Sequence, residues 1–111
     1  MPRDIFSAIS DPTRRQVLDL LTRRERAAGD LGRAFPDISQ PGMSRHLRIL
    51  REAGLVRVRQ ERRHRYYSLH SERLAEVDAW VSKYRAFWGT ELDSLEAYLD
   101  AKKVARKEGR T

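Results

Sequence analysis

Apolar residues recur with helical spacing along the first part of the chain. Ile5, Phe6 and Ile9 form a short apolar stripe, which predicts a first helix. The stretch SDPTRRQVLDLLTRRE predicts a second helix, since Asp11 is a good N-cap and Pro12 loses no useful hydrogen bond at the first helical position. The predicted buried face of this second helix comprises Val17, Leu18, Leu20 and Leu21.

Two more helices, separated by a turn, are predicted before the pattern changes. Gly29 ends or interrupts the second helix, and DLGRAF, residues 30–35, predicts a short third helix that Pro36 closes. After a turn over residues 36–39, a fourth helix is predicted over residues 40–53. A helix, a turn and a second helix in this order predict a helix-turn-helix.

The fourth helix has start and stop signals of its own. Ser39 or Gln40 can cap it, and Pro41 suits its first turn. Gly54 suits a left-handed C-terminal stop. Its predicted buried positions, at i, i+4 and i+7, are Met43, Leu47 and Leu50. A wide polar face remains for a partner, and it carries Gln40, Ser44, Arg45, Arg48 and Arg51.

After Gly54 the period of the pattern changes from 3.6 to 2, which predicts a hairpin. LVRVRQ alternates valine with arginine, and HRYYSL, residues 64–69, can pair back with it. The predicted turn lies near Glu61, Arg62 and Arg63. Because the turn lacks Asn-Gly or Asp-Gly, we expect a loop longer than two residues.

The helical period returns at Ser71 and lasts to about Asp100. A helix of about 30 residues would be about 45 Å long, and a domain of this size cannot cover its wide aromatic face alone. The stripe comprises Leu74, Val77, Val81, Tyr84, Trp88, Leu95 and Leu99, widened by Trp80, Phe87, Leu92 and Tyr98. The fold class predicted from these elements is mainly α, with a winged helix-turn-helix over residues 1–100 and a disordered basic tail over 101–111.

Charge is unevenly distributed, and this points to an anionic partner for one part of the chain. The net charge is +7, and residues 39–65 hold eight basic and two acidic residues. Residues 71–100 hold three basic and seven acidic ones. Nucleic acid or an acidic surface is therefore the favoured class of partner. The absence of a signal sequence and of an apolar run of about 20 residues predicts a cytoplasmic protein without a membrane partner.

Three motifs resemble the ArsR/SmtB family of bacterial transcriptional repressors. They are SDPTRRQVLDLL, SQPGMSRHLRILREAGLV and the RRHRYYSL wing, and the resemblance extends from Ile5 to Leu99. It implies a homodimer whose first and last helices form the interface. The interface residues expected on this basis are Ile5, Phe6, Trp80, Tyr84, Phe87, Trp88, Leu92 and Leu95.

The resemblance also implies DNA contact through the fourth helix and the wing. Gln40, Ser44 and Arg45 match the family's major-groove contacts, with Pro41 where some members have a polar residue. Arg45 can offer a bidentate donor pair to guanine, and Gln40 can do the same for adenine. Contacts to the DNA backbone or minor groove are expected from Ser39, Arg48, Arg62, Arg63, His64 and Arg65. For Arg51, a phosphate or an internal carboxylate such as that of Glu52 is expected.

A metal site is not expected. The chain has no cysteine, and the positions of the family's last-helix metal set hold Asp78, Trp80, Glu91 and Ser94, so both histidines are missing. His46, His64 and His70 do not form a ligand set on one element. No cofactor is expected either. The aromatic stripe could also line an effector pocket, but dimer packing is favoured, and the inducing signal is unknown.

The function predicted from these observations is that of a homodimeric repressor, which binds an inverted-repeat operator through residues 40–53 and a wing over residues 56–69. The alternative is a winged-helix module that binds an acidic protein or binds DNA non-specifically. Enzymatic activity is not expected, because no Ser-His-acid grouping or phosphate-cradling glycine loop occurs in the sequence.

Overall fold

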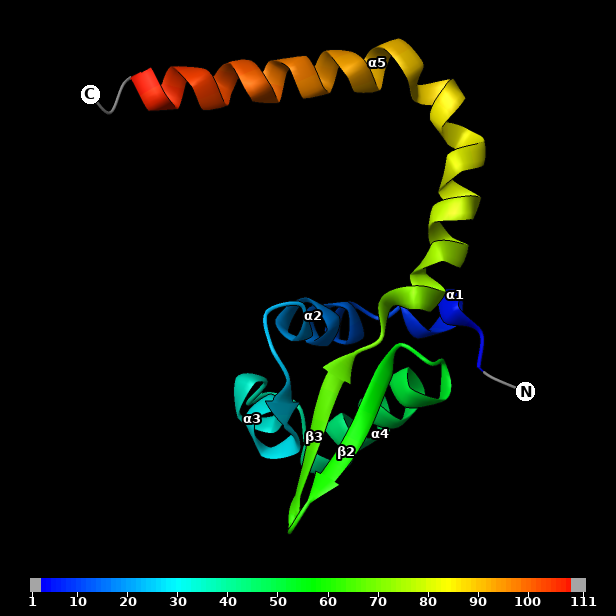
Figure 1. The fold of residues 1–111 in the computed structure, drawn as a ribbon, viewed down its shortest axis with the longest axis vertical. Coiled ribbons are helices and arrows are strands. Elements are labelled where there is room, and N and C mark those ends of the chain that lie inside the picture. Colours follow the sequence, from blue (N-terminus) through cyan, green and yellow to red (C-terminus); the bar gives the residue numbers. More distant parts are fainter. Residues whose placement is uncertain (1–2, 109–111) are drawn as a thin grey trace. The chain divides into compact units, whose positions relative to one another are not determined.

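The computed structural model describes the backbone of residues 3–108 and the side chains of residues 3–88 and 95–102. The helices are α1 (Ile5–Ala8), α2 (Pro12–Leu21), α3 (Ala28–Ala34), α4 (Gln40–Glu52), the 3-10 helix η1 (Ser71–Arg73) and α5 (Leu74–Glu108) (Figure 1). The strands are β1 (Arg26–Ala27), β2 (Val56–Glu61) and β3 (His64–Leu69). By its contacts the chain divides into a first unit up to Val77 and a second unit from Asp78 onward. This arrangement confirms the mainly helical winged helix-turn-helix.

The helices begin where side chains satisfy their free backbone N–H groups. Asp11 accepts a hydrogen bond from the N–H of Arg14 at 3.0 Å, and Ser39 Oγ accepts one from the N–H of Gly42 at 3.1 Å. Such caps stabilise a helix by about 1 kcal/mol. At the other end of α4, Gly54 has a φ of 75°, which is the predicted left-handed stop.

The sheet contains three antiparallel strands in the order β1-β3-β2. Strands β2 and β3 pair from Val56 with Leu69 to Glu61 with His64. The predicted longer loop was therefore wrong, because only Arg62 and Arg63 lie between these last partners. Arg62 takes up the reversal with a φ of 56°, a conformation that costs a residue with a side chain about 1–2 kcal/mol.

Helices α2 and α3 have other bounds than the sequence predicts, because strand β1 lies between them. Arg26 pairs with Tyr67, and Ala27 pairs with Tyr66, so the chain is extended there. As a result α2 ends at Leu21 well before Gly29, and α3 begins at Ala28 and includes that glycine. A strand of two residues is too short for the period of the pattern to indicate it.

The last helix is longer than the sequence predicts. It continues past Asp100 to Glu108, so the first part of the predicted disordered tail is helical. The predicted bounds of a single domain, 1–100, stay a prediction.

The core of the first unit joins α1–α4 to the hairpin. Predicted positions Met43, Leu47 and Leu50 of α4 are all buried. Complete burial of one such side chain stabilises the fold by about 1.5–3 kcal/mol. The remaining buried residues are Ile5, Ala8, Val17, Leu18, Leu21, Leu31, Ile49, Ala53, Leu55, Val56 and Tyr67. Leu20, which was predicted on the buried face of α2, is only partly buried.

Candidate nucleic-acid interface

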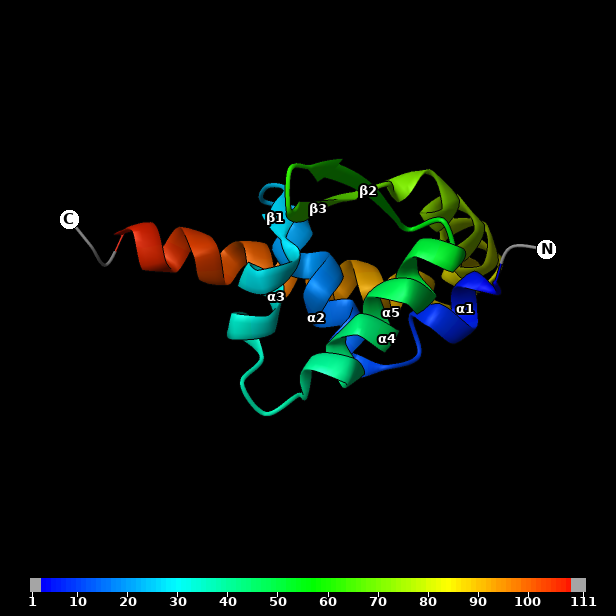
Figure 2. The same cartoon turned by 90° about the horizontal axis from the view of Figure 1, so that it is seen from below.

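Helix α4 presents a polar face to solvent. Its buried face packs against α2 and the hairpin, and Figure 2 shows α4 in front of α2 with β2 and β3 along one side. The residues predicted to contact bases or nearby backbone are all exposed: Ser39, Gln40, Pro41, Ser44, Arg45 and Arg48. Ser39 Oγ accepts the N–H of Gly42, which leaves its own O–H available as a donor.

The tip of the hairpin carries the predicted wing residues. Arg62, Arg63, His64 and Arg65 are exposed. Arg59 differs, because its guanidinium is 2.8 Å from Glu25 Oε1 and 2.6 Å from Glu61 Oε2. Hydrogen bonds to Glu25 and Glu61 raise the pKa of Arg59 above its ordinary value. Its guanidinium also lies 4.5 Å from the ring centre of Tyr66, so Arg59 braces the hairpin instead of facing a partner.

Several arginines near this surface have no acidic partner. Within the described part of the chain, the side chains of the following residues form no ion pair or hydrogen bond: Arg45, Arg48, Arg51, Arg62 and Arg63. Glu52, the expected partner of Arg51, is instead bound by Arg3 at 2.7 Å. Within the described residues, these arginines of α4 and the wing tip are therefore not held in ion pairs by the protein's own carboxylates.

Two concave surfaces flank α4. One, of about 320 Å³, lies between α3 and α4 and is lined by Ala28, Gly29, Gly32, Arg33, Ile38, Gln40, Met43, Ser44 and Leu47. The other, of about 340 Å³, lies between α4 and β3 and is lined by Ala28, Ser44, Leu47, Arg48, Arg51, Arg65 and Tyr67. Ala28, Ser44 and Leu47 line both, and of the two that belong to α4 only Ser44 is exposed.

His46 faces the protein, on the side of α4 that contacts α2. Its Nδ1 is 3.1 Å from Nη1 of Arg14, whose Nε donates to the carbonyl of Ala8 at 2.6 Å. Because arginine only donates, His46 Nδ1 is the acceptor. Burial would raise the pKa of Asp11, but the hydrogen bond from the N–H of Arg14 and the charge of the Arg14 guanidinium hold it below its ordinary value. These contacts give His46 a packing role between α4 and α2.

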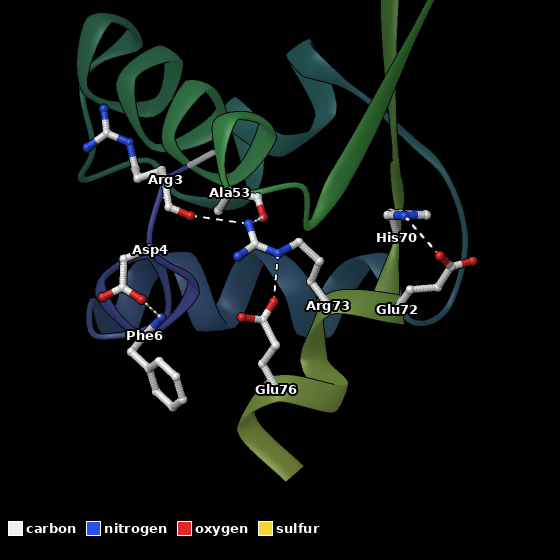
Figure 3. A network of polar contacts seen from close by, with 8 residues as sticks. All are labelled: Arg3, Asp4, Phe6, Ala53, His70, Glu72, Arg73 and Glu76. Carbon is white, nitrogen blue, oxygen red and sulfur yellow. Dashed lines mark hydrogen bonds and ion pairs between the residues drawn. The ribbon is translucent and has the colours of Figure 1, made fainter. Parts of the chain in front are cut away.

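The C-terminal end of α4 is held by a polar network that sequence reasoning missed (Figure 3). Arg73 Nη1 donates to the carbonyl of Ala53 and, at 3.2 Å, to that of Arg3, while its Nε donates to Glu76 Oε2 at 2.8 Å. A Cβ added to Gly54 would lie 3.0 Å from Arg73 Cδ. Arg73 therefore joins the N-terminal segment, the end of α4 and the start of α5. Its partners lie up to 70 residues away, so no local pattern could indicate them.

The chain resembles known regulators over most of its length. Residues 9–59 match a family model described as a helix-turn-helix domain. The transcriptional repressor SdpR of Bacillus subtilis is 40% identical over 81 residues, which cover 73% of this chain and 89% of SdpR. A solved ArsR family transcriptional regulator has a TM-score of 0.69 and 31% identity, covering 78% of this chain and 88% of its own.

The chain belongs to the ArsR family. A second solved structure, a possible transcriptional regulator for arsenical resistance, is 42% identical with a TM-score of 0.63, and the match covers 82% of this chain and 91% of the other. This ArsR family protein is thus a DNA-binding transcriptional regulator, not an enzyme.

Two further features of this ArsR family protein concern membrane-spanning helices and groups of metal ligands. No helix among them is both long enough and apolar enough to cross a membrane. Within the same residues, no three His, Asp or Glu side chains form a group that could hold a metal ion.

The residues expected at a dimer interface divide into two groups. Ile5 is 1% exposed and fills the core of the first unit. Its side chain has no surface left for a second copy, so the expected place of Ile5 at the dimer interface is wrong. The others with described side chains are large apolar residues that remain exposed: Phe6, Trp80, Tyr84, Phe87, Trp88 and Leu95. Leu92 lies outside the described side chains. On α5 the rings of Trp80 and Tyr84 are in edge contact, with centroids 5.3 Å apart.

Proposed function

We propose that this ArsR family regulator is a homodimeric repressor that binds an inverted-repeat operator. Two copies of α4 enter successive major grooves about 34 Å apart, and the bound dimer occludes the promoter. The observation that carries the proposal is the exposed face of α4, whose arginines have no acidic partner in the described structure while Arg59 nearby is fully paired. Such uncompensated charge favours a polyanion.

The exposed face supports a division of roles. Gln40 can pair with adenine and Arg45 with guanine, while Pro41 and Ser44 lie beside them on the first turns of α4. The remaining contacts, to backbone phosphates or the minor groove, come from Ser39, Arg48, Arg62, Arg63, His64 and Arg65. Arg62 and Arg63 form the turn between β2 and β3, the part of the wing that extends farthest along the hairpin.

The exposed aromatic side chains of α5 support the dimer. Phe87 is 82% exposed, and Trp80, Tyr84 and Trp88 are each close to half exposed. Aromatic residues are enriched in protein interfaces, and contiguous exposed apolar patches mark interaction sites. A second copy of α5 supplies a surface of the same chemistry, and a twofold dimer matches a palindromic operator.

Selection of bound sequences from random DNA, followed by footprinting, tests the proposal. We expect a protected inverted repeat, with affinity that falls roughly 10³- to 10⁵-fold between about 50 and 200 mM salt. Uniform protection would instead indicate non-specific architectural binding. No binding of DNA at low salt would leave the acidic-protein alternative.

Two substitutions then test the division of roles. Arg45→Ala should weaken binding to the selected site by about 1–3 kcal/mol more than binding to random DNA. Arg63→Ala should weaken both alike and lower the salt slope by about one. Equal losses on the two kinds of DNA from both variants would refute the assignment of Arg45 to a base.

A further inference from the structure

We infer that the concave surface between α4 and β3, called here the α4–β3 pocket, binds one phosphate of the DNA backbone. Its three cationic residues are Arg48, Arg51 and Arg65, and they come from two different elements. This inference rests on the proposed function. It adds a single defined phosphate site. Of the two partners expected for Arg51 from the sequence, it selects the phosphate, because Glu52 is bound by Arg3.

The secondary structure directs the three arginines into one place. Ser44, Arg48 and Arg51 are at i, i+4 and i+7 of α4, so they share one side of that helix. Arg65 and Tyr67 are two residues apart on β3, so they lie on the same face of the sheet. Tyr67 is buried in the core, which shows that this face of the sheet is the one turned inward toward the helices.

The pocket has the composition of a site for an anion. Its volume is about 340 Å³, and no carboxylate lines it. The hydrogen bonds of Arg3, at 2.7 and 2.9 Å, are the main cause that lowers the pKa of Glu52, and the charges of Arg48 and Arg51 add to this effect from farther away. Glu61 on β2 is bound by Arg59. Three guanidinium groups thus share a pocket that no carboxylate lines, and none of the three is in an ion pair within the described structure. Guanidinium groups bind phosphate through paired N–H donors.

The position of the pocket identifies the phosphate as one from DNA. In the proposed complex α4 lies in the major groove, and the tip of the wing reaches the backbone or the adjacent minor groove. A sugar-phosphate strand separates those two grooves, so it must pass between the helix and the wing. The α4–β3 pocket lies between these same two elements. Phosphate contacts of this kind fix the register of a protein on the duplex.

The test compares Arg51→Ala with Arg57→Ala. Arg57 is an exposed arginine of β2 opposite Ser68, one position out of step with Tyr67 and so on the other face of the sheet. Arg51→Ala should reduce affinity about eightfold at about 0.1 M salt and lower the salt slope by about 0.9, the effect of one lost phosphate contact. Arg57→Ala should leave the slope unchanged. Equal slopes for the two variants would overturn the inference.

A neutral linkage in the DNA locates the phosphate. Single methylphosphonate groups are placed in turn along one half-site of the selected operator. At one position we expect the methylphosphonate to lower the DNA affinity of the wild-type protein about eightfold and that of Arg57→Ala by as much. At the same position the affinity of Arg51→Ala should fall no further. The inference would be overturned if, at every position, the loss of affinity from the methylphosphonate added to the loss from Arg51→Ala.

Two controls separate the possible failures. If wild type selects no inverted repeat, the proposed function fails, but the slopes of Arg51→Ala and Arg57→Ala on a random duplex still test the pocket. Titration with inorganic phosphate in the absence of DNA tests the source of the ligand. Arg51-dependent saturation at millimolar phosphate that leaves DNA affinity unchanged at constant ionic strength would show a free-anion site and overturn the assignment to DNA. Competition between phosphate and DNA, or no binding of phosphate at that concentration, supports the assignment.

Discussion

Replacement of Arg73 by alanine should destabilise the first unit by loosening the end of α4. The guanidinium donates to the carbonyls of Ala53 and Arg3 and to Glu76, and its side chain is 26% exposed. Hydrogen bonds from charged groups contribute about 1.5–3 kcal/mol, while an exposed ion pair adds about 0–1 kcal/mol. Because Arg73 keeps partial contact with solvent, we expect a loss of about 2–3 kcal/mol in the free energy of unfolding.

Thermal and urea unfolding measure this loss. For a domain of this size, 1 kcal/mol corresponds to roughly 4–8 °C in Tm, so Arg73→Ala should lower Tm by roughly 10–20 °C. Protein concentrations must be equal, since a dimer gains apparent stability by mass action. The matched control is Arg85→Ala, because among the side chains that the structure describes Arg85 pairs only with Asp78, at 2.7 Å on the same helix, and both side chains are exposed. A loss for Arg73→Ala no larger than that of the control would refute the reasoning.

Gly54→Ala provides an independent check on the same contact. Its φ of 75° costs an alanine about 1–2 kcal/mol, and the added methyl group meets Arg73 Cδ at 3.0 Å. The backbone strain persists without Arg73, whereas the clash does not. The double variant should therefore lose about 0.5–1 kcal/mol less than the two single losses combined. Strict additivity would show that the side chain of Arg73 does not lie over Gly54.

Three further predictions concern other parts of the protein. The hydrogen bond and charge of Arg3 hold the pKa of Glu52 below its ordinary value. The stability that this pair contributes is therefore complete above the ordinary pKa and should be lost as the pH falls through the lowered pKa. Unfolding measured across this pH range should show a smaller loss of stability for Glu52→Gln than for wild type. Arg62→Gly should keep or raise Tm, because glycine adopts the φ of 56° without strain. The same substitution should lower DNA affinity about eightfold at about 0.1 M salt, because one cation is lost. A variant that loses both Tm and DNA affinity would contradict this prediction. Phe87→Lys should give monomers in analytical ultracentrifugation with an unchanged helical content by circular dichroism, and a dimer that persists would contradict the proposed interface.

Local features of the sequence predicted most of the helical framework. Asp11, Ser39 and Gly54 act within a few residues of their own positions, so caps and stops can be inferred without a fold. The apolar period of α4 also determined which face of that helix would be buried. The exposed face followed from the same period, and the ArsR-like motifs indicated what such a face binds.

Tertiary structure alone decided which charges are free and which are paired. Arg59 binds Glu25, 34 residues away, and Arg73 reaches the carbonyl of Arg3, 70 residues away. In the sequence both arginines look like the unpaired Arg51. The two-residue turn and β1 depend likewise on pairing with β3. Periodicity records the environment averaged over one face of an element, whereas ion pairs and strand ends depend on single contacts that the chain makes only once it has folded.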